Sequence, residues 1–417
     1  MLIEFSVRNF KSFRSKQTLS MVAAPRLGKK RNVFKPNVPG EDLPNLLKVA
    51  AIYGPNASGK SSLVSAINIV CSLLHPSIVD REKLPVNSFR FDPELKDQPS
   101  WFEYHFIAEG KRYQFVLAAT SERIYEETLT SYQKGKETQL YSRTYNEASG
   151  EQYILSKDLE GGVVVHNAWR NLTSPKSLFL SQAVANSSEE LNQLRTPFNW
   201  FRSSAVCISQ DGMSNWGVLS RSMLIHNQKH KDNLKNFLQK VDVPVTDIRF
   251  ENLHSEAFKV SQPTKFLEHV KATESVKTIL THTTLLGEAE FDFDEESGGT
   301  QNLMGFWLPW QLLCNENSTG VVVVDELDSS LHPKIVENLV ETHIDSGTCA
   351  QLIFTTHDTH LMNTKILRRD QFWITERDAY GATTLFSVHD FQGRDSEDVE
   401  KRYYEGRYRG LPILRRS

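Results

Sequence analysis

A glycine-rich segment near the N-terminus carries the clearest chemistry in the sequence. Residues 54–61 read GPNASGKS, a full match to GxxxxGK[ST] that follows an apolar segment and opens an amphipathic one. Its glycines let backbone N–H groups point into a concavity around phosphate oxygens, and a helix N-terminus favours negative charge. Lys60 is expected to reach the β- and γ-phosphates, and Ser61 to ligate magnesium. The predicted phosphate-binding residues are Gly54, Pro55, Asn56, Ala57, Ser58, Gly59, Lys60, Ser61 and Ser62.

Two carboxylates follow an apolar run much later in the chain. The segment GVVVVDELDSSLHP places four valines directly before Asp325 and Glu326. This order fits an aspartate on the magnesium side, followed by a glutamate that polarises water. Most of the chain separates Lys60 from Asp325, a spacing that compact GTPases and small kinases do not have, and the sequence contains no NKxD motif for guanine. We therefore expect the ligands to be ATP and Mg²⁺.

Two further segments extend the expected site. ESGGTQNL places Ser297, Gly298 and Gly299 before a helical stretch, and such a turn at a helix start can hold an anion. The chain would then have two phosphate-binding turns, which need not serve the same nucleotide. FTTHDTH follows another apolar run and places His357 at its tip. In this setting His357 is a candidate sensor of the γ-phosphate.

The composition limits the classes of protein to which these residues belong. The 417 residues suffice for about two to three domains, and 39% hydrophobic with 24% charged residues is typical of a folded globular chain. The net charge of −3 argues against binding nucleic acid by bulk charge. The four cysteines form no CxxC pair, so neither a zinc site nor a disulfide framework is indicated. Without a signal peptide or a spanning segment, we expect a cytoplasmic location and no membrane partner.

Hydrophobic periodicity predicts strands in both halves of the chain. LIEFSVRNF alternates apolar and polar residues near the N-terminus, and WFEYHFI and YQFVL flank a turn at Gly110, as in a hairpin. The runs VVVV at 321–324 and QLIFTT at 351–356 are typical of strands covered on both faces. Between these halves lie helical stretches such as SSEELNQLRTPFNWF and HKDNLKNFLQKV.

These elements predict an α/β fold with a mixed sheet, an antiparallel β subdomain and an inserted helical domain. The core is then discontinuous, since both halves of the expected site lie outside the helical stretch. The predicted parts are an N-terminal core part at 1–182, a helical insertion at 183–285 and a C-terminal core part at 286–417.

Taken in this order, the segments resemble the ABC-type P-loop ATPases of the SMC and RecF kind. They are most similar to the short bacterial branch found in anti-phage systems, as with the ATPase subunits AriA and RloA. RNFKSF resembles the family's first strand and places Lys11 near the nucleotide, and GPNASGKS resembles the Walker A loop. ESGGTQ stands where the signature LSGGQ stands, with one extra residue before Gln301, and VVVVDE resembles Walker B with Glu326 as catalytic carboxylate. LDSS at 327–330 resembles the D-loop, and His357 the switch histidine.

The resemblance also implies a glutamine that contacts magnesium and senses the attacking water. SLFLSQ places Gln182 at the end of an expected strand that enters the helical insertion, which makes Gln182 the first candidate. Gln98, in a polar loop, is the alternative.

The resemblance implies a switch made of two copies of the chain. ATP would be held between the Walker A loop of one copy and the Ser297 turn of the other, and hydrolysis would weaken the interface. The leading hypothesis is the ATPase and sensor subunit of an anti-phage system, controlling a separate nuclease or toxin in response to a nucleic acid or a phage protein.

A DNA-repair or DNA-end-binding ATPase is the alternative hypothesis. The tail KRYYEGRYRG could stack on a strand and neutralise it, because tyrosines alternate there with Lys401, Arg402, Arg407 and Arg409. A transporter ATPase subunit is less favoured, since the antiparallel hairpins and the large insertion do not fit that class.

Overall fold

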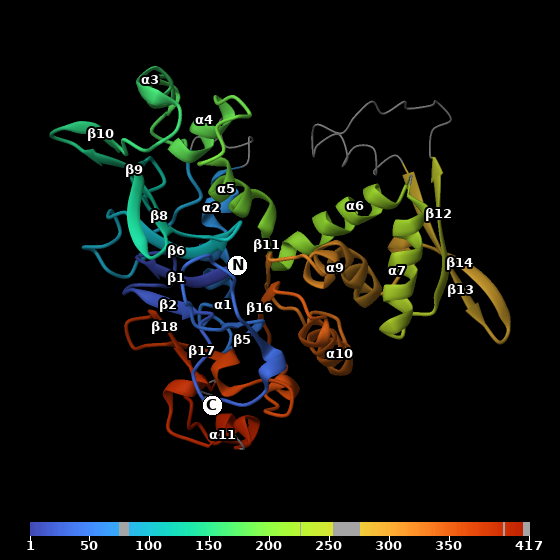
Figure 1. Ribbon diagram of the computed structural model, residues 1–417. Helices are drawn as coiled ribbons and strands as arrows, with labels where there is room; N and C mark the ends of the chain where they lie inside the picture. Colours follow the sequence, from blue (N-terminus) through green and yellow to red (C-terminus); the bar gives the residue numbers. More distant parts are fainter. Residues whose placement is uncertain (75–82, 226, 253–275, 395–396, 412–417) are drawn as a thin grey trace.

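Two large β-sheets, with helices between and beside them, form the body of the protein. The computed structural model describes residues 1–74, 83–225, 227–252, 276–394 and 397–411. The N-terminal third of the chain supplies most of the first sheet, whereas strands from both halves of the chain build the second (Figure 1). The α/β class predicted from periodicity is confirmed.

The first sheet is antiparallel, with strand order β10-β9-β8-β7-β6-β1-β2. Strands β6 and β7 are the hairpin expected from the sequence, and Gly110 in its turn has φ of 70°. The bounds of the seven strands are β1 Leu2–Arg8, β2 Gln17–Ser20, β6 Ser100–Ala108, β7 Lys111–Ala119, β8 Ile124–Gln133, β9 Lys136–Asn146 and β10 Gly150–Leu155.

The second sheet is mixed, with strand order β11-β15-β16-β5-β17-β18. All neighbouring pairs are parallel except β17 with β18. The runs VVVV and QLIFT are buried at every position, as expected for strands covered on both faces. The bounds are β5 Val49–Tyr53, β11 Ala205–Ile208, β15 Val321–Val324, β16 Gln351–Thr355, β17 Phe372–Arg377 and β18 Thr383–Ser387.

Helices cover both faces of the mixed sheet. Helices α1 and α2 follow β5 on the face toward the antiparallel sheet, and α9 and α10 cover the opposite face. The α-helices are α1 Lys60–Ile67, α2 Ile69–Leu73, α3 Gly162–Leu172, α4 Phe179–Ala185, α5 Arg195–Asn199, α6 Met213–Leu224, α7 Gln228–Lys240, α9 Gly298–Cys314, α10 Pro333–Asp345 and α11 Val399–Tyr404. The short 3-10 or π helices are η1 Lys30–Asn32, η3 Trp200–Ser204, η4 Gln210–Gly212, η5 Phe293–Glu295, η6 Thr359–Leu361, η7 Arg369–Gln371 and η8 Val388–Asp390.

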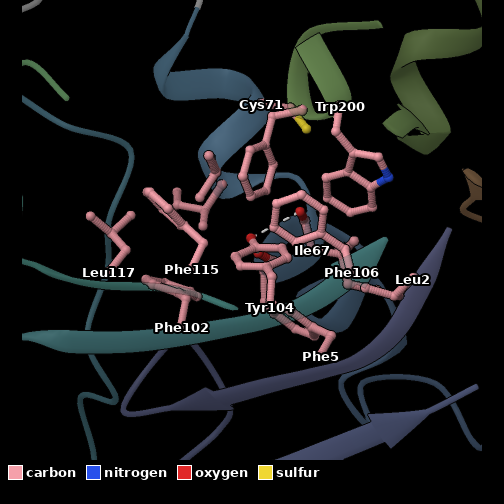
Figure 2. Close-up of a cluster of buried hydrophobic side chains, with 14 of the residues drawn as sticks. Leu2, Phe5, Ile67, Cys71, Phe102, Tyr104, Phe106, Phe115, Leu117 and Trp200 are labelled. Carbon is pink, nitrogen blue, oxygen red and sulfur yellow. Dashed lines mark hydrogen bonds between the residues drawn. The ribbon is translucent and has the colours of Figure 1, made fainter. Parts of the chain in front are cut away.

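An aromatic core joins the two sheets and fixes the helix that follows the glycine-rich loop. The ring of Phe106 on β6 stacks on Trp200 of η3 at 4.2 Å, within a larger cluster that includes α1 and α2 (Figure 2). The hydroxyl of Tyr104 donates to the carbonyls of Ala66 and Ile67, each at 3.0 Å. These contacts hold α1 against the antiparallel sheet, because aromatic burial and satisfied hydroxyls favour one packing arrangement.

The predicted helical insertion at 183–285 is only partly helical. Strand β11 lies inside it and pairs with β15, so this segment contributes to the mixed sheet. Strands β12 (Val245–Asn252), β13 (Val276–Thr284) and β14 (Gly287–Asp292) form a separate antiparallel sheet beside α7. The expected boundary at residue 285 falls in the turn between β13 and β14. The β-branched residues of β12 and β13 favour strands. The helical stretches nearby nevertheless led to the prediction of one helical segment.

Short elements complete the fold. Strands β3 (Val33–Phe34) and β4 (Leu46–Leu47) pair with each other. No helix in the described part of the chain is both long and apolar enough to cross a membrane.

Candidate nucleotide site

Three parallel strands of the mixed sheet end at one edge, and the predicted site lies there. Register places Ile52 of β5 opposite Thr355 of β16, and β15 lies on the other side of β16. Parallel strands present their carboxyl ends at a common edge, where ligands bind in open α/β sheets. Strand β5 leads into the glycine-rich loop with Lys60, β15 leads to Asp325, and β16 leads to His357. The structure thus brings these three segments to the same edge.

The glycine-rich loop has the backbone shape that phosphate binding needs. Gly54 has φ of 149° and Gly59 has φ of 107°, backbone angles that residues other than glycine rarely adopt. A Cβ on Gly59 would lie 2.1 Å from Thr383 Oγ1, and one on Gly54 would lie 2.4 Å from the Thr375 carbonyl oxygen. The loop is therefore a cradle that only glycine permits at these two positions.

Lys60 lies over this loop, and its amine forms no ion pair with a carboxylate in the part of the chain that the structure describes. Its amine donates to the carbonyls of Gly54 at 2.8 Å and Pro55 at 3.2 Å. Burial lowers the pKa of Lys60, and three nearby carboxylates act in the opposite direction, those of Glu326, Asp325 and Asp328. A buried cation that is held only by neutral carbonyls is well placed to receive an anionic ligand.

Thr355 at the end of β16 fixes both carboxylates that follow β15. Its hydroxyl donates to Asp325 Oδ1 at 2.6 Å and accepts the backbone N–H of Glu326 at 2.8 Å. Asp325 is buried, whereas Glu326 is partly exposed and has φ of 54°, an uncommon conformation for glutamate. Asp325 is therefore held rigidly, and Glu326 is turned outward where water can reach it. Thr355 belongs to the apolar run at 351–356 and carries no motif that predicts this role.

His357 lies beside Glu326, as its proposed role requires. Its Nε2 is 4.0 Å from Glu326 Oε1, and its backbone N–H donates to Asp328 Oδ2 at 3.2 Å. The imidazole is 41% exposed, so it can contact a bound ligand without unfolding of the edge.

Gln210, which the sequence analysis missed, contacts Glu326 directly. Gln210 lies two residues after the end of β11, and its side-chain amide donates to Glu326 Oε2 at 2.7 Å. Gln210, Asp325 and Glu326 also line a cavity of about 90 Å³ at the end of β15. Gln210 is therefore held against the predicted catalytic carboxylate, at the cavity that Asp325 also lines.

Gln182 does not lie at the end of a strand, contrary to expectation. It is inside α4, and its side-chain oxygen accepts a 3.4 Å hydrogen bond from Asn186 of the same helix segment. The alternative, Gln98, lies in a loop beside the antiparallel sheet. Its backbone carbonyl accepts a hydrogen bond from the side-chain amide of Asn9. Both SLFLSQ and AVCISQ are apolar runs ending in Ser-Gln. The two leucines favour a helix in the first run, whereas valine and isoleucine favour a strand in the second.

Lys11 lies next to the glycine-rich loop, as expected from RNFKSF. Its amine donates to Ser65 Oγ on α1 at 2.9 Å, and Asp325 is the charged group that counters the lowering of the Lys11 pKa by burial. The adjacent Ser12 Oγ is 2.7 Å from Thr383 Oγ1, which in turn is 2.8 Å from the Ser58 carbonyl. The N-terminal segment and β18 therefore brace the loop from one side.

The Ser297 turn caps α9 and packs on the LDSS segment of its own chain. Ser297 Oγ accepts the Thr300 N–H at 3.1 Å, so the serine is an N-cap. A Cβ on Gly299 would lie 2.6 Å from the Ser330 carbonyl oxygen, so glycine is needed for this approach. Among the described residues, no hydrogen bond joins Ser297 to the glycine-rich loop. The nucleotide role of Ser297, Gly298 and Gly299 stays a prediction.

The residues at this edge fit a magnesium-bound nucleoside triphosphate. Two buried polar atoms here, Asp328 Oδ1 and Tyr53 Oη, have no hydrogen-bond partner in the part of the chain that the structure describes. In the same part, no group of three acidic, histidine or cysteine side chains could hold a metal alone, and Mg²⁺ usually combines one or two protein oxygens with phosphates and water. Lys60 would hold the phosphates, and Ser61 and Asp325 the metal. The metal would supply neutralisation of charge on the transferring phosphate.

Two of the three tyrosines in the C-terminal tail pack inward and are not available to stack on a strand. Tyr403 and Tyr408 are buried, and the Tyr403 hydroxyl donates to the Gly410 carbonyl at 2.7 Å. Arg402 pairs with Glu397 at 2.7 Å, and Arg407 pairs with Glu405 at 3.2 Å. Tyr403 and Tyr408 therefore pack the tail onto the core, whereas Tyr404 is 61% exposed.

The glycine cradle, its lysine and the acidic pair that follows a parallel strand of the same sheet define a P-loop domain of the nucleotide-binding class. The sequence model of one protein family, described as "AAA domain, putative AbiEii toxin, Type IV TA system", matches residues 49–363. The chain belongs to this family. No curated protein matches the sequence.

Three solved structures of SMC heads are similar to the chain. The SMC head bound to the C-winged helix domain of ScpA is 13% identical, with a TM-score of 0.48, and the match covers 93% of this chain and 97% of that one. The SMC head domain from Thermotoga maritima is 14% identical, with a TM-score of 0.42, covering 93% and 98%. An SMC head with an extended coiled coil, bound to the C-terminal domain of ScpA from Pyrococcus furiosus, is 12% identical, with a TM-score of 0.44, covering 97% and 99%.

Proposed function

We propose that this protein binds and hydrolyses ATP and acts as a switch that closes as a homodimer around the nucleotide. One observation carries the proposal: Lys60, the acidic pair after β15 and His357 meet at one edge of the mixed sheet. In this reaction Asp325 and Ser61 ligate magnesium, Glu326 polarises the attacking water, and His357 with Gln210 orients the γ-phosphate side of the site.

The second half of the proposal concerns the partner copy. Ser297 is the N-cap of α9, a long helix, and the positive end of a helix favours an anion. A second copy would present its Ser297 turn to the γ-phosphate of the first. Loss of that phosphate removes the shared anion and weakens the interface, which is how hydrolysis would open the dimer.

We further propose a role in anti-phage defence, close to the AriA and RloA branch. The family description names the AbiEii toxin and a type IV toxin–antitoxin system, and this supports a place in a conflict between cell and phage. The chain would be the ATPase and sensor subunit that holds a separate nuclease or toxin, with a nucleic acid or a phage protein as trigger. Co-expression with the products of neighbouring genes tests this role, since a toxic product that co-purifies in an ATP-dependent manner supports it and its absence from every preparation contradicts it.

Two substitutions test the nucleotide chemistry. Lys60→Ala removes the cation over the phosphate cradle and should abolish ATP binding in a fluorescent-nucleotide titration. Glu326→Gln keeps the shape of the site but not the base, so ATP should still bind while the hydrolysis rate falls by about 10²–10⁴-fold. Normal turnover in both purified variants would contradict the assignment of this site.

An ATPase that acts directly on DNA is the second candidate. Two aromatic side chains, Phe91 and Tyr380, are 69% and 70% exposed, and each lies under an arginine: Arg377 at 5.6 Å and Arg14 at 5.5 Å. Exposed rings with nearby cations are the features on which nucleic-acid bases stack. Salt-sensitive DNA binding that stimulates hydrolysis favours this candidate, whereas no DNA binding at low salt excludes it.

A further inference from the structure

The residue just before Ser297 is held from outside its own helix. Glu296 Oε1 lies 2.6 Å from Nε2 of His282 on β13, and the two side chains are only 7% and 16% exposed. An imidazole N–H that donates to a mostly buried carboxylate is a strong contact, because the carboxylate has few other donors to replace it. The β12–β14 sheet is thereby attached to the start of α9.

The opposite side of this segment is braced by α9 and α6. The side-chain amide of Gln301 donates to the carbonyls of Phe293 at 3.0 Å and Glu296 at 3.1 Å. The guanidinium of Arg221 on α6 lies 4.0 Å from the centre of the Phe293 ring. Since Gln301 is used within the chain, the position of residues 293–297 depends on these braces and on His282.

The far side of the Ser297 turn touches the nucleotide edge. The Asn302 amide donates to the Ser329 carbonyl at 3.0 Å, and Gly299 packs on Ser330. Ser329 and Ser330 directly follow Asp328. The turn therefore lies between the LDSS segment on one side and the β12–β14 sheet on the other.

The β12–β14 sheet is a peripheral part of the molecule. It lies beyond α7, on the side away from the two large sheets (Figure 1). Every residue of β14 from Gly287 to Phe291 is exposed, so the described residues do not cover this strand. A displacement of the sheet can reach the Ser297 turn through the contact between His282 and Glu296.

We propose that His282 is a positioning residue for the second phosphate-binding turn, and that the β12–β14 sheet controls ATP-dependent closure of the dimer through its contact with Glu296. This inference rests on the proposed function. A partner that moves the sheet would shift Ser297 relative to the γ-phosphate of the facing copy, and thereby favour or oppose closure without touching the Lys60 loop.

The test compares substitutions in the β12–β14 sheet by two measurements, ATP-dependent self-association and kcat for ATP hydrolysis. His282→Ala should weaken ATP-dependent self-association and lower kcat by about tenfold, because it removes one strong hydrogen bond. The ATP affinity of the single chain should not change, because the Lys60 loop is untouched. His282→Gln keeps an N–H donor and should restore much of both losses. Arg249→Ala is the control, because Arg249 on β12 forms exposed ion pairs with Glu251 of the same strand and Glu290 of β14. This variant should behave as the unsubstituted chain.

The outcomes separate this inference from the proposed function. If Lys60→Ala binds ATP as the unsubstituted chain does, or if ATP never promotes self-association, the proposed function fails and this inference fails with it. If Lys60 is required and ATP promotes association, but His282→Ala matches Arg249→Ala in both readouts, only the inference is overturned. It is also overturned if His282→Gln is as impaired as His282→Ala and both lower the melting temperature equally, since the contact is then structural.

Discussion

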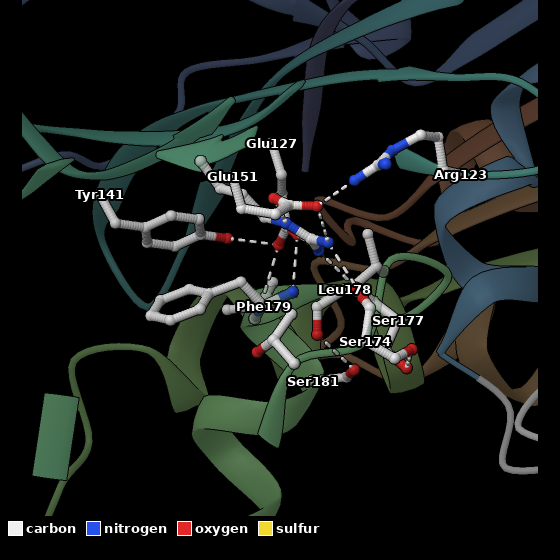
Figure 3. Close-up of polar contacts among 12 residues, drawn as sticks. Arg123, Glu127, Tyr141, Glu151, Ser174, Ser177, Leu178, Phe179 and Ser181 are labelled. Carbon is white, nitrogen blue, oxygen red and sulfur yellow. Dashed lines mark hydrogen bonds and ion pairs between the residues drawn. The ribbon is translucent and has the colours of Figure 1, made fainter. Parts of the chain in front are cut away.

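Two regions of this protein place carboxylates beside cations, and the charged groups of the two regions differ in how many hydrogen-bond partners they have. In the cluster on β8 and β9, Glu127 is fully buried and accepts hydrogen bonds from the Tyr141 hydroxyl and from the backbone N–H groups of Phe179 and Leu180 (Figure 3). Arg143 lies 3.9 Å from Glu127 and directs its other donors to Glu151 and to the carbonyls of Ser174 and Ser177. The hydrogen-bonding groups of this cluster are thus used within the chain.

At the nucleotide edge the same kinds of groups are left partly unused. The Lys60 amine donates only to carbonyls of its own loop, and Asp328 Oδ1 has no hydrogen-bond partner among the described residues. Burial raises the pKa of Glu127 and lowers that of Lys60, so both regions resist carrying charge. The difference shows that a buried charge with a complete set of partners holds a fold together, whereas one with an incomplete set is placed to bind a ligand.

The largest expected effect concerns the closed cluster. Arg143→Ala leaves the Glu127 carboxylate without its cation and two carbonyls without donors, so the free energy of unfolding should fall by about 3–5 kcal/mol. Urea unfolding measures this change, with Arg249→Ala as a control in an exposed ion pair that should cost less than about 1 kcal/mol. A loss below about 1 kcal/mol for Arg143→Ala would erase the contrast between the two regions.

A smaller effect is expected at the open edge, where function rather than stability should respond. Gln210→Ala removes the hydrogen bond to Glu326, and kcat for ATP hydrolysis should fall about tenfold while the free energy of unfolding changes little. Gln182→Ala is the matched control, since among the described residues that side chain forms a hydrogen bond only with Asn186, just after α4. Steady-state kinetics distinguish the two, and a loss in Gln182→Ala without one in Gln210→Ala would return the assignment to Gln182.

The smallest effect is a pH dependence in the antiparallel sheet. Hydrogen bonds from His105, Lys16 and Gln114 lower the pKa of Glu103 to about 2 from its ordinary value of 4.5. The stability from this group is therefore present above pH 4.5 and is lost as the pH falls toward 2. Solvent screening limits it to about 1–2 kcal/mol. Glu103→Gln should lower the free energy of unfolding at pH 7 by this amount, and the gap to the unsubstituted chain should close in acid; a gap that stays constant from pH 7 to pH 3 would contradict the assignment.

The parts of the site that were predictable lie in contiguous segments. GPNASGKS and VVVVDE each combine a buried strand with the functional residues at its end, so local sequence specifies both the element and the chemistry. Gln210 was not predictable in this way, because β11 is a strand only through its pairing with β15, and Gln210 meets Glu326 across a separation of 116 residues. Thr355 was missed for a similar reason, since its role depends on the neighbouring strand.

By itself, the sequence determined which segments bear the phosphate chemistry, because glycine, lysine and paired carboxylates act through local backbone shape and charge. It also determined the alternation of strands that gives the α/β class. Only the tertiary structure decided that residues 245–252 and 276–292 form a sheet and that this sheet contacts the Ser297 turn through His282. It also decided that Tyr403 and Tyr408 of the tail pack inward. These features depend on contacts between residues far apart in the chain, whose energies no local pattern encodes.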